Sequence, residues 1–277
     1  MTNMVINWKE YSENDCKGED MWGHYKTPNG DLYVVADGAS SHDGEETGGD
    51  VARYIDTRLK QDAANITRTN HIKELIHSIN ADSTTINDGA YAAIGGILHR
   101  ADRMFAFSAG DVSILAKKPS GKLLQALPLD LNMQSDDAEK TAITEIGTFV
   151  NGREITAENY ILRAKQYTQH GLYNAIGIGD SFFLNEKHFY TKDDAVLLIA
   201  SDGITDPFME PQREVGEIPQ ANAPKLYELL NSNENAETAV EALKDLIWDT
   251  QVIEKKKIKS DDRTGIFIYM NAATKDA

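Results

Sequence analysis

Ala195-Val196-Leu197-Leu198-Ile199-Ala200 is an apolar run that passes directly into Ser201-Asp202-Gly203. Six consecutive apolar residues, most of them large and several β-branched or branched at Cγ, predict a buried strand. A glycine after the acidic residue lets the backbone turn sharply, so we expect Asp202 on a rigid element at the edge of a sheet. Taken alone, an Asp-Gly pair is typical of an ordinary turn.

An acidic residue next to a glycine or a turn recurs at three other places. They are Ala36-Asp37-Gly38, Ala109-Gly110-Asp111 and Ser260-Asp261-Asp262-Arg263-Thr264. A further aspartate, Asp206, lies four residues beyond Asp202. Gathered carboxylates repel one another unless a cation lies between them, and Mg²⁺ or Mn²⁺ suits an oxygen-only set without His or Cys. The four places together therefore predict a divalent-metal site.

Hydrophobic patterning predicts a mixture of strands and helices. We expect strands at 32–36, 90–98, 104–108, 112–117, 123–127, 195–200 and 265–270. We expect helices beginning just after Gly44 and at 71–80, 158–167 and 236–247. Asp37-Gly38 should end the first strand. No Pro/Ser/Gly-rich linker divides the sequence, so we expect one domain over residues 1–277, with mobile loops in its least regular region, around 130–179.

Charge and composition exclude several classes of partner. The sequence has 277 residues, with 28 Lys and Arg against 44 Asp and Glu, a formal charge of −16. Such a surface repels nucleic acid and anionic lipid, and no apolar run approaches the roughly 20 residues that a membrane span needs. The single cysteine, Cys16, cannot form an intrachain disulfide. We therefore expect a cytoplasmic protein, a monomer, with no nucleic-acid or membrane partner.

Five motifs, in order along the chain, resemble those of the metal-dependent serine/threonine protein phosphatases of type 2C, in their bacterial form. The opening acidic pair is matched by Glu19-Asp20, and the first Asp-Gly signature by Val35-Ala36-Asp37-Gly38 with His42, Gly44 and Glu45. Gly110-Asp111-Val112-Ser113 is similar to the family's Gly-Asp-Ser turn, with Val112 in place of the usual serine. The second Asp-Gly motif is matched by Ile199-Ala200-Ser201-Asp202-Gly203-Ile204-Thr205-Asp206, and the closing motif by Asp261-Asp262-Arg263-Thr264.

The resemblance implies a fold and an activity. The fold is α+β, a four-layer α-β-β-α sandwich in which two antiparallel sheets pack face to face and helices flank them. The activity is hydrolysis of phosphoserine and phosphothreonine in a phosphorylated protein substrate. A metal-activated water at a binuclear Mg²⁺ or Mn²⁺ centre would attack the phosphoryl group.

The resemblance also implies a role for each site residue. Asp37 would bridge two metal ions and the Gly38 carbonyl would bind one of them. Asp202 and Asp261 would complete the set, and Asp20 would act mainly through metal-bound water. A third, weaker position would use Asp111 and Asp206. His42 would be the general acid for the leaving oxygen; the alternative is an ordinary surface histidine.

One departure from the family pattern leaves other functions open. Many members carry a phosphate-binding arginine five residues before the opening aspartate, where this sequence has Asp15. Lys17, Lys26 or Arg263 could supply that cation instead. The alternatives to an active phosphoprotein phosphatase are a pseudophosphatase that binds a protein partner and a small-molecule phosphoesterase or nuclease. The acidic charge disfavours a nuclease.

Overall fold

The computed structural model describes residues 4–13, 18–40, 48–86, 90–100, 103–117, 123–127, 149–150, 153–154, 174–190, 195–208, 223–250 and 261–272. Its strands are β1 (Met4–Glu13), β2 (Met21–Thr27), β3 (Gly30–Ser40), β4 (Ala90–Arg100), β5 (Arg103–Ala109), β6 (Ser113–Lys117), β7 (Leu123–Gln125), β8 (Phe149–Val150), β9 (Arg153–Glu154), β10 (Asn185–Tyr190), β11 (Ala195–Ala200) and β12 (Arg263–Ala272). Its helices are α1 (Gly48–Asp62), α2 (Thr69–Ile86), α5 (Asp202–Thr205), α6 (Pro224–Ser232) and α7 (Ala236–Trp248), with short 3-10 turns η1 (Ala63–Asn65) and η2 (Gly179–Ser181).

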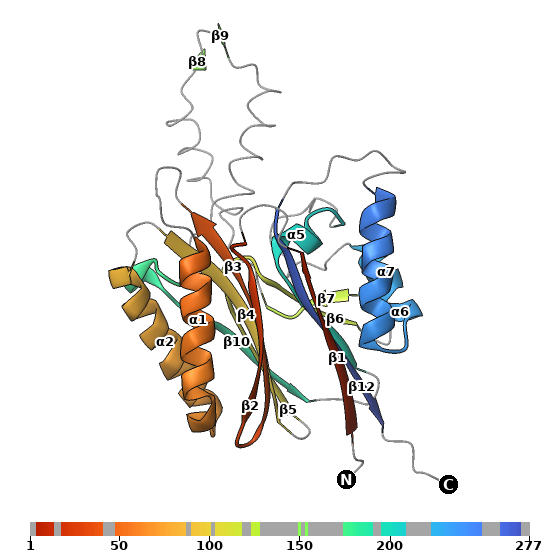
Figure 1. Ribbon diagram of the computed structural model, residues 1–277, viewed down its shortest axis with the longest axis horizontal. Helices are drawn as coiled ribbons and strands as arrows, with labels where there is room; N and C mark the ends of the chain where they lie inside the picture. Colours follow the sequence, from red (N-terminus) through yellow and green to blue (C-terminus); the bar gives the residue numbers. More distant parts are fainter. Residues whose placement is uncertain are drawn as a thin grey trace.

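Two five-stranded antiparallel sheets face each other (Figure 1). The first sheet has the strand order β10-β5-β4-β3-β2, and the second has the order β1-β12-β11-β6-β7. β8 and β9 form a separate two-stranded pair. β1 and β12 pair along their whole length, from Met4 opposite Ala272 to Glu13 opposite Arg263. The first and last described strands of the chain therefore lie side by side.

Neighbouring residues of the central strands face different layers. In β3, Val34 packs in the cluster beneath α1 and α2, whereas Val35 packs between the two sheets. In β11, Leu198 packs with residues of α6 and α7, whereas Ile199 packs between the sheets. This alternation follows from the two-residue period of a strand. Because both faces of β11 are covered, its sequence is a continuous apolar run.

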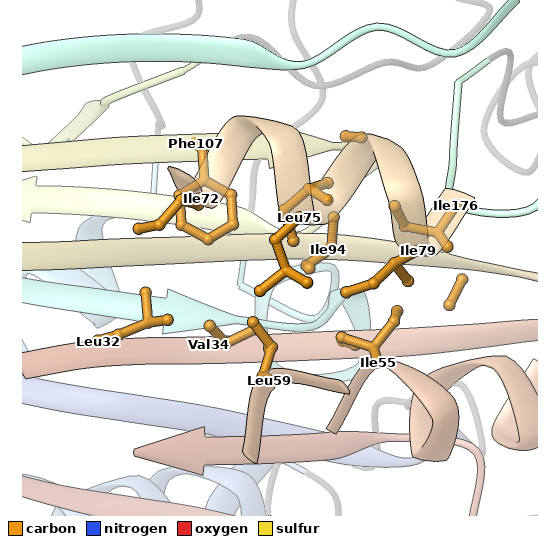
Figure 2. Packing of buried hydrophobic residues seen from close by; sticks show 14 of the residues in the cluster. Leu32, Val34, Ile55, Leu59, Ile72, Leu75, Ile79, Ile94, Phe107 and Ile176 are labelled. Carbon is orange, nitrogen blue, oxygen red and sulfur yellow. The ribbon is translucent and has the colours of Figure 1, made fainter. Parts of the chain in front are cut away.

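Helices cover the outer face of each sheet. Figure 2 shows Ile55 and Leu59 of α1 and Ile72 and Ile79 of α2 close to the apolar side chains of the first sheet. The second sheet is covered in the same way by α6 and α7 (Figure 1). The layers are thus α-β-β-α, which confirms the α+β architecture expected from the resemblance. Among the helices that the structure describes, none combines the length and the apolar character needed to cross a membrane.

The predicted elements were partly wrong in extent. Asp37-Gly38 does not end β3, because residues up to Ser40 continue to pair with the first residues of β4. The sequence did not predict four elements, which are β1, β2, β10 and α6. Among them, β2 is an edge strand of the first sheet and β1 is an edge strand of the second, and edge strands mix polar with apolar residues. The predicted helix at 158–167 lies outside the described residues, as does most of the region around 130–179.

Candidate active site

The register of the first sheet places three of the candidate aspartates at one level. Asp20 immediately precedes β2, Asp37 lies in β3, and Asp111 follows β5 by two residues. Ala36 pairs with the first residue of β2 on one side and with Ile94 of β4 on the other, and Ile94 pairs with the last residue of β5. The three carboxylates are therefore carried to the same end of this sheet.

The second sheet brings two more aspartates to that end. Asp202 opens α5 directly after β11, and Asp261 lies two residues before β12. Ala200, the last residue of β11, pairs with Gly265 of β12 and with Ser113 of β6. The short turn that contains Asp111 joins β5 of the first sheet to β6 of the second. Because this turn is only three residues long, the ends of both sheets that carry the aspartates must coincide.

The pKa of Asp37 reflects the other carboxylates around it. Its carboxylate is enclosed by protein, although the residue as a whole keeps a partly exposed surface. Burial raises the pKa of Asp37 well above its ordinary value, and the negative charges of Asp20, Asp202, Asp111 and Asp261 raise it further. Four of the other candidate aspartates therefore act on Asp37.

Asp20 is perturbed in the same direction. Burial raises the pKa of Asp20 to about 7, and the charges of Asp202 and Asp262 add to the rise. Hydrogen bonds with Ser201 and Asp37 oppose it without cancelling it. Positive charge brought to carboxylates in such surroundings would favour their ionised form near neutral pH. The electrostatics of the site thus favour a cation.

Hydrogen bonds join the loops that carry these aspartates. The backbone N–H of Glu19 donates to Oδ2 of Asp262 at 2.7 Å, which ties the segment before β2 to the segment before β12. The N–H of Asp262 donates to Oδ1 of Asp261 at 3.1 Å. The N–H of Thr264 donates to Oγ of Ser201 at 3.0 Å, and the N–H of Ser201 donates to the Thr264 carbonyl at 2.9 Å.

Two of the glycines are required by close backbone approaches. A Cβ atom on Gly38 would lie 2.4 Å from the carbonyl carbon of Gly48, the first residue of α1. A Cβ atom on Gly203 would lie 2.1 Å from the carbonyl oxygen of Asp262. Neither neighbour could avoid a side chain by rotating, because both are backbone atoms. The glycine after Asp37 and the glycine after Asp202 therefore let α1 and the β12 loop close on the site.

Solved structures share this architecture over nearly the whole chain. The serine/threonine phosphatase Stp1 from Staphylococcus aureus aligns with a TM-score of 0.67 at 18% identity, covering 96% of this chain and 95% of that one. The catalytic domain of the serine/threonine phosphatase PstP, solved with two manganese ions, aligns with a TM-score of 0.63 at 15% identity, covering 97% and 100%. This chain has the fold of the type 2C (PPM) serine/threonine phosphatases. No family model and no curated protein matches the sequence.

The donor chemistry of the site fits a hard divalent cation in this phosphatase fold. All five gathered side chains offer carboxylate oxygens, and Oδ2 of Asp20 is buried without a hydrogen-bond partner among the described residues. A buried, unpaired carboxylate oxygen is costly unless something positive binds it. In the described part of the chain, however, no group of three or more His, Cys, Asp or Glu side chains is already arranged to hold a metal ion. The candidate ligands are neighbours in the fold, but their side chains are not arranged as a coordination shell.

The remaining predicted residues are Asp111, which is one of the five gathered carboxylates, and Asp206 and His42, which are not. Asp111 is partly exposed at its turn, and Asp206 is exposed at the end of α5, where its N–H donates to the Asp202 carbonyl at 2.8 Å. The phosphatase fold thus places Asp206 one helical turn beyond Asp202, at the outer edge of the site. His42 lies outside the described residues.

Of the three cations proposed to replace the arginine, Lys26 and Arg263 are each paired with a carboxylate that is not a predicted metal ligand. Lys26 forms an ion pair with Asp31, its cross-strand neighbour near the β2–β3 turn, at the other end of the strands. Arg263 is only 2% exposed, and its Nη1 lies 3.1 Å from Oε2 of Glu13. Lys17 lies outside the described residues.

Sequence reasoning did not assign a role to Ser201, Asp262 or the backbone of Glu19. Ser201 and Asp262 each adjoin a predicted ligand, so the motifs contained them. Nothing local to the chain shows that Asp262 binds the Glu19 N–H, because the two residues are 243 positions apart. Only the tertiary structure reveals that these three groups join the loops that carry the candidate aspartates.

Proposed function

We propose that this protein hydrolyses phosphoserine and phosphothreonine in protein substrates at a divalent-metal site. The observation that carries the proposal is the gathering of five carboxylates from both sheets at one end of a type 2C phosphatase fold. Such a set is suited to Mg²⁺ or Mn²⁺. Asp37, the Gly38 carbonyl, Asp202, Asp261 and Asp20 would hold two ions, and a third would lie toward Asp111 and Asp206.

The chain's own groups would orient the reaction. Bound cations supply positive charge to the phosphoryl oxygens and make water more acidic. Ser201 and Asp262 keep the ligand loops in register, so the substrate phosphorus is presented in a fixed position to water. Water adds to phosphorus, the bond to the serine or threonine oxygen breaks, and that oxygen takes up a proton. His42, protonated as an imidazolium, would deliver this proton, and the proton released by the attacking water would restore the imidazolium. The products are the free hydroxyl side chain and inorganic phosphate.

A pseudophosphatase is the second candidate. It is favoured by the lack of a ready-made ligand group in the described residues and by Asp15, which stands where many relatives by fold carry arginine. The intact aspartates argue against it, since a binding module has no need of five gathered carboxylates. A phosphatase and a pseudophosphatase would share this fold, so only a measurement of turnover distinguishes them.

Hydrolysis of an aryl phosphate and of a phosphothreonine peptide tests the proposal. Purified protein is assayed with Mn²⁺, with Mg²⁺ and with EDTA, alongside Asp202→Ala and the control Asp245→Ala, which removes an exposed aspartate on α7. We expect metal-dependent release of phosphate that Asp202→Ala abolishes and Asp245→Ala retains. Calorimetric Mn²⁺ binding without turnover would favour the pseudophosphatase. Absence of Mn²⁺ binding would show that the ligand assignment is wrong.

A further inference from the structure

The negative charge of the site disfavours binding of the phosphorylated substrate that the proposed function requires. A phosphate monoester carries close to two negative charges near neutral pH. The gathered carboxylates repel it, and two divalent ions, with four positive charges, would not by themselves neutralise both the five carboxylates and the phosphate. A cation held at the rim, outside the metal ligands, would favour binding of the phosphoryl group.

Arg53 is placed at that rim by the first turns of α1. An ideal Cβ position on Gly49 lies 3.1 Å from Nη1 of Arg53, 3.2 Å from Cα of Glu19 and 3.2 Å from the carbonyl oxygen of Gly18. Glu19 is the residue before Asp20, and its N–H is bound to Asp262. The guanidinium group of Arg53 is therefore beside the segment that carries Asp20 into the site.

The helix geometry explains how Arg53 reaches this position. Side chains of an α-helix tilt toward its N-terminus, so residue 53 covers the surface above residue 49. Gly49 has no side chain, and the guanidinium group lies over it instead of being pushed outward. The N-terminal turn of α1, which closes on Gly38, adds the positive end of the helix dipole at the same place.

The ion pair that Arg53 forms in this structure can break when a substrate binds. Arg53 is paired with Asp50, three residues earlier in α1, and both side chains are well exposed, at 61% and 43%. Exposed pairs of this kind contribute little to stability and exchange readily for a stronger anion. Arg263, by contrast, is buried and held by Glu13.

We propose that Arg53 binds the phosphoryl group of the substrate, leaving Asp50 when it does so. The inference rests on the proposed function and deepens it, because it assigns substrate binding to α1. A planar guanidinium group can donate two parallel hydrogen bonds to phosphoryl oxygens, which an ammonium group cannot match. Arg53→Lys should therefore restore only part of the binding.

The kinetic test compares Arg53→Gln, Arg53→Lys and Asp50→Asn with a matched control. The control is Lys60→Gln, which removes an exposed cation of the same helix that is paired with Asp56 one turn away. We expect Arg53→Gln to raise KM about tenfold for the aryl phosphate and the peptide alike, with a smaller change in kcat. Asp50→Asn should lower KM because it removes the competing carboxylate, and Lys60→Gln should leave KM unchanged.

Calorimetry with inorganic phosphate and Mg²⁺-loaded protein supplies a readout that needs no turnover. We expect Arg53→Gln to weaken phosphate binding by a similar factor.

The possible outcomes separate this inference from the proposed function. If the wild type binds phosphate but hydrolyses neither substrate, and Arg53→Gln does not bind phosphate, the inference stands and the proposed hydrolysis fails. Unchanged KM and phosphate affinity in Arg53→Gln would overturn the inference alone. A KM effect confined to the peptide would also overturn it, because Arg53 would then contact flanking residues. A wild type that neither binds nor hydrolyses phosphate overturns both.

Discussion

Arg263 is a charged side chain that is almost completely buried, two positions after the candidate ligand Asp261. It is among the largest side chains that the fold encloses, and its Nη1 lies 3.1 Å from Oε2 of Glu13. Its Cγ would lie 3.3 Å from a Cβ atom on Gly203, so it packs against the start of α5. Glu13 ends β1, a few residues before Asp20. The pair therefore fastens the end of β1 to the loop that carries Asp261.

Replacing Arg263 tests this role in stability. Arg263→Met removes an enclosed side chain and its hydrogen bond to Glu13, and we expect it to lower the free energy of unfolding by about 1–3 kcal/mol. Glu13→Gln should cost less, since Glu13 is 42% exposed and an amide oxygen still accepts from Arg263. Urea denaturation followed by circular dichroism measures both. Equal stability of Arg263→Met and the wild type would contradict a structural role for the pair.

Helix α1 serves the core and the site with different residues. Val51, Ile55 and Leu59, spaced four apart, are fully buried in the cluster that α1 shares with the first sheet and α2. Ile55 and Leu59 are labelled in Figure 2. Its first residue lies against Gly38, next to Asp37 in β3. Packing of the apolar stripe therefore determines how closely the N-terminal turn approaches the carboxylates.

The stability contributed by the α1 stripe can be measured by truncating one side chain. Ile55→Ala removes buried atoms from a tightly packed cluster, and we expect a loss of about 2–5 kcal/mol in the free energy of unfolding. Lys60→Ala, an exposed substitution on the same helix, should change it by less than about 0.5 kcal/mol. Thermal and urea unfolding of both variants make the comparison. A loss in Ile55→Ala no greater than that in Lys60→Ala would show that α1 is not anchored by this stripe.

At the scale of the whole molecule, the fold gathers like charges and thereby makes its stability depend on pH. The folded-state pKa of Asp20 is about 7, against an ordinary value of 3.8, and that of Asp37 is also raised. A raised carboxylate pKa means that the folded state prefers the protonated form. Its contribution to stability is complete below the ordinary pKa and is lost as pH rises through the raised one.

The metal-free protein should therefore become less stable as pH rises. After EDTA treatment, we expect Tm to fall between about pH 5 and pH 8, and Asp20→Asn to flatten the dependence because it removes one titrating group. Mn²⁺ at 100 times its Kd should restore about 2.7 kcal/mol at the upper pH. Differential scanning calorimetry across this range measures all three. A Tm of the EDTA-treated wild type that rises from pH 5 to pH 8 would contradict the raised pKa values.

Local patterns were enough to predict many elements and the motifs. The strand at 195–200 has the predicted bounds, and the helix predicted at 236–247 is α7, one residue longer. Runs and periods of apolar residues depend only on neighbours in sequence, so they are readable there. The sandwich came from the order of the motifs through their family resemblance and not from the patterns themselves. The roles assigned to Asp20, Asp37, Gly38, Asp111, Asp202, Asp206, Asp261 and His42 remain predictions.

By itself, then, the sequence determined where buried strands and amphipathic helices form and which acidic residues lie next to the ends of the strands. The tertiary structure decided what those residues meet. It extended β3 beyond Asp37, enclosed Arg263 with Glu13, joined Glu19 to Asp262 and laid Arg53 over Gly49. Two of these contacts, Glu13 with Arg263 and Glu19 with Asp262, join residues more than two hundred positions apart, so they form only when the fold brings distant parts of the chain together. Burial and proximity of charge are properties of that assembly, whereas apolar periodicity is a property of the chain.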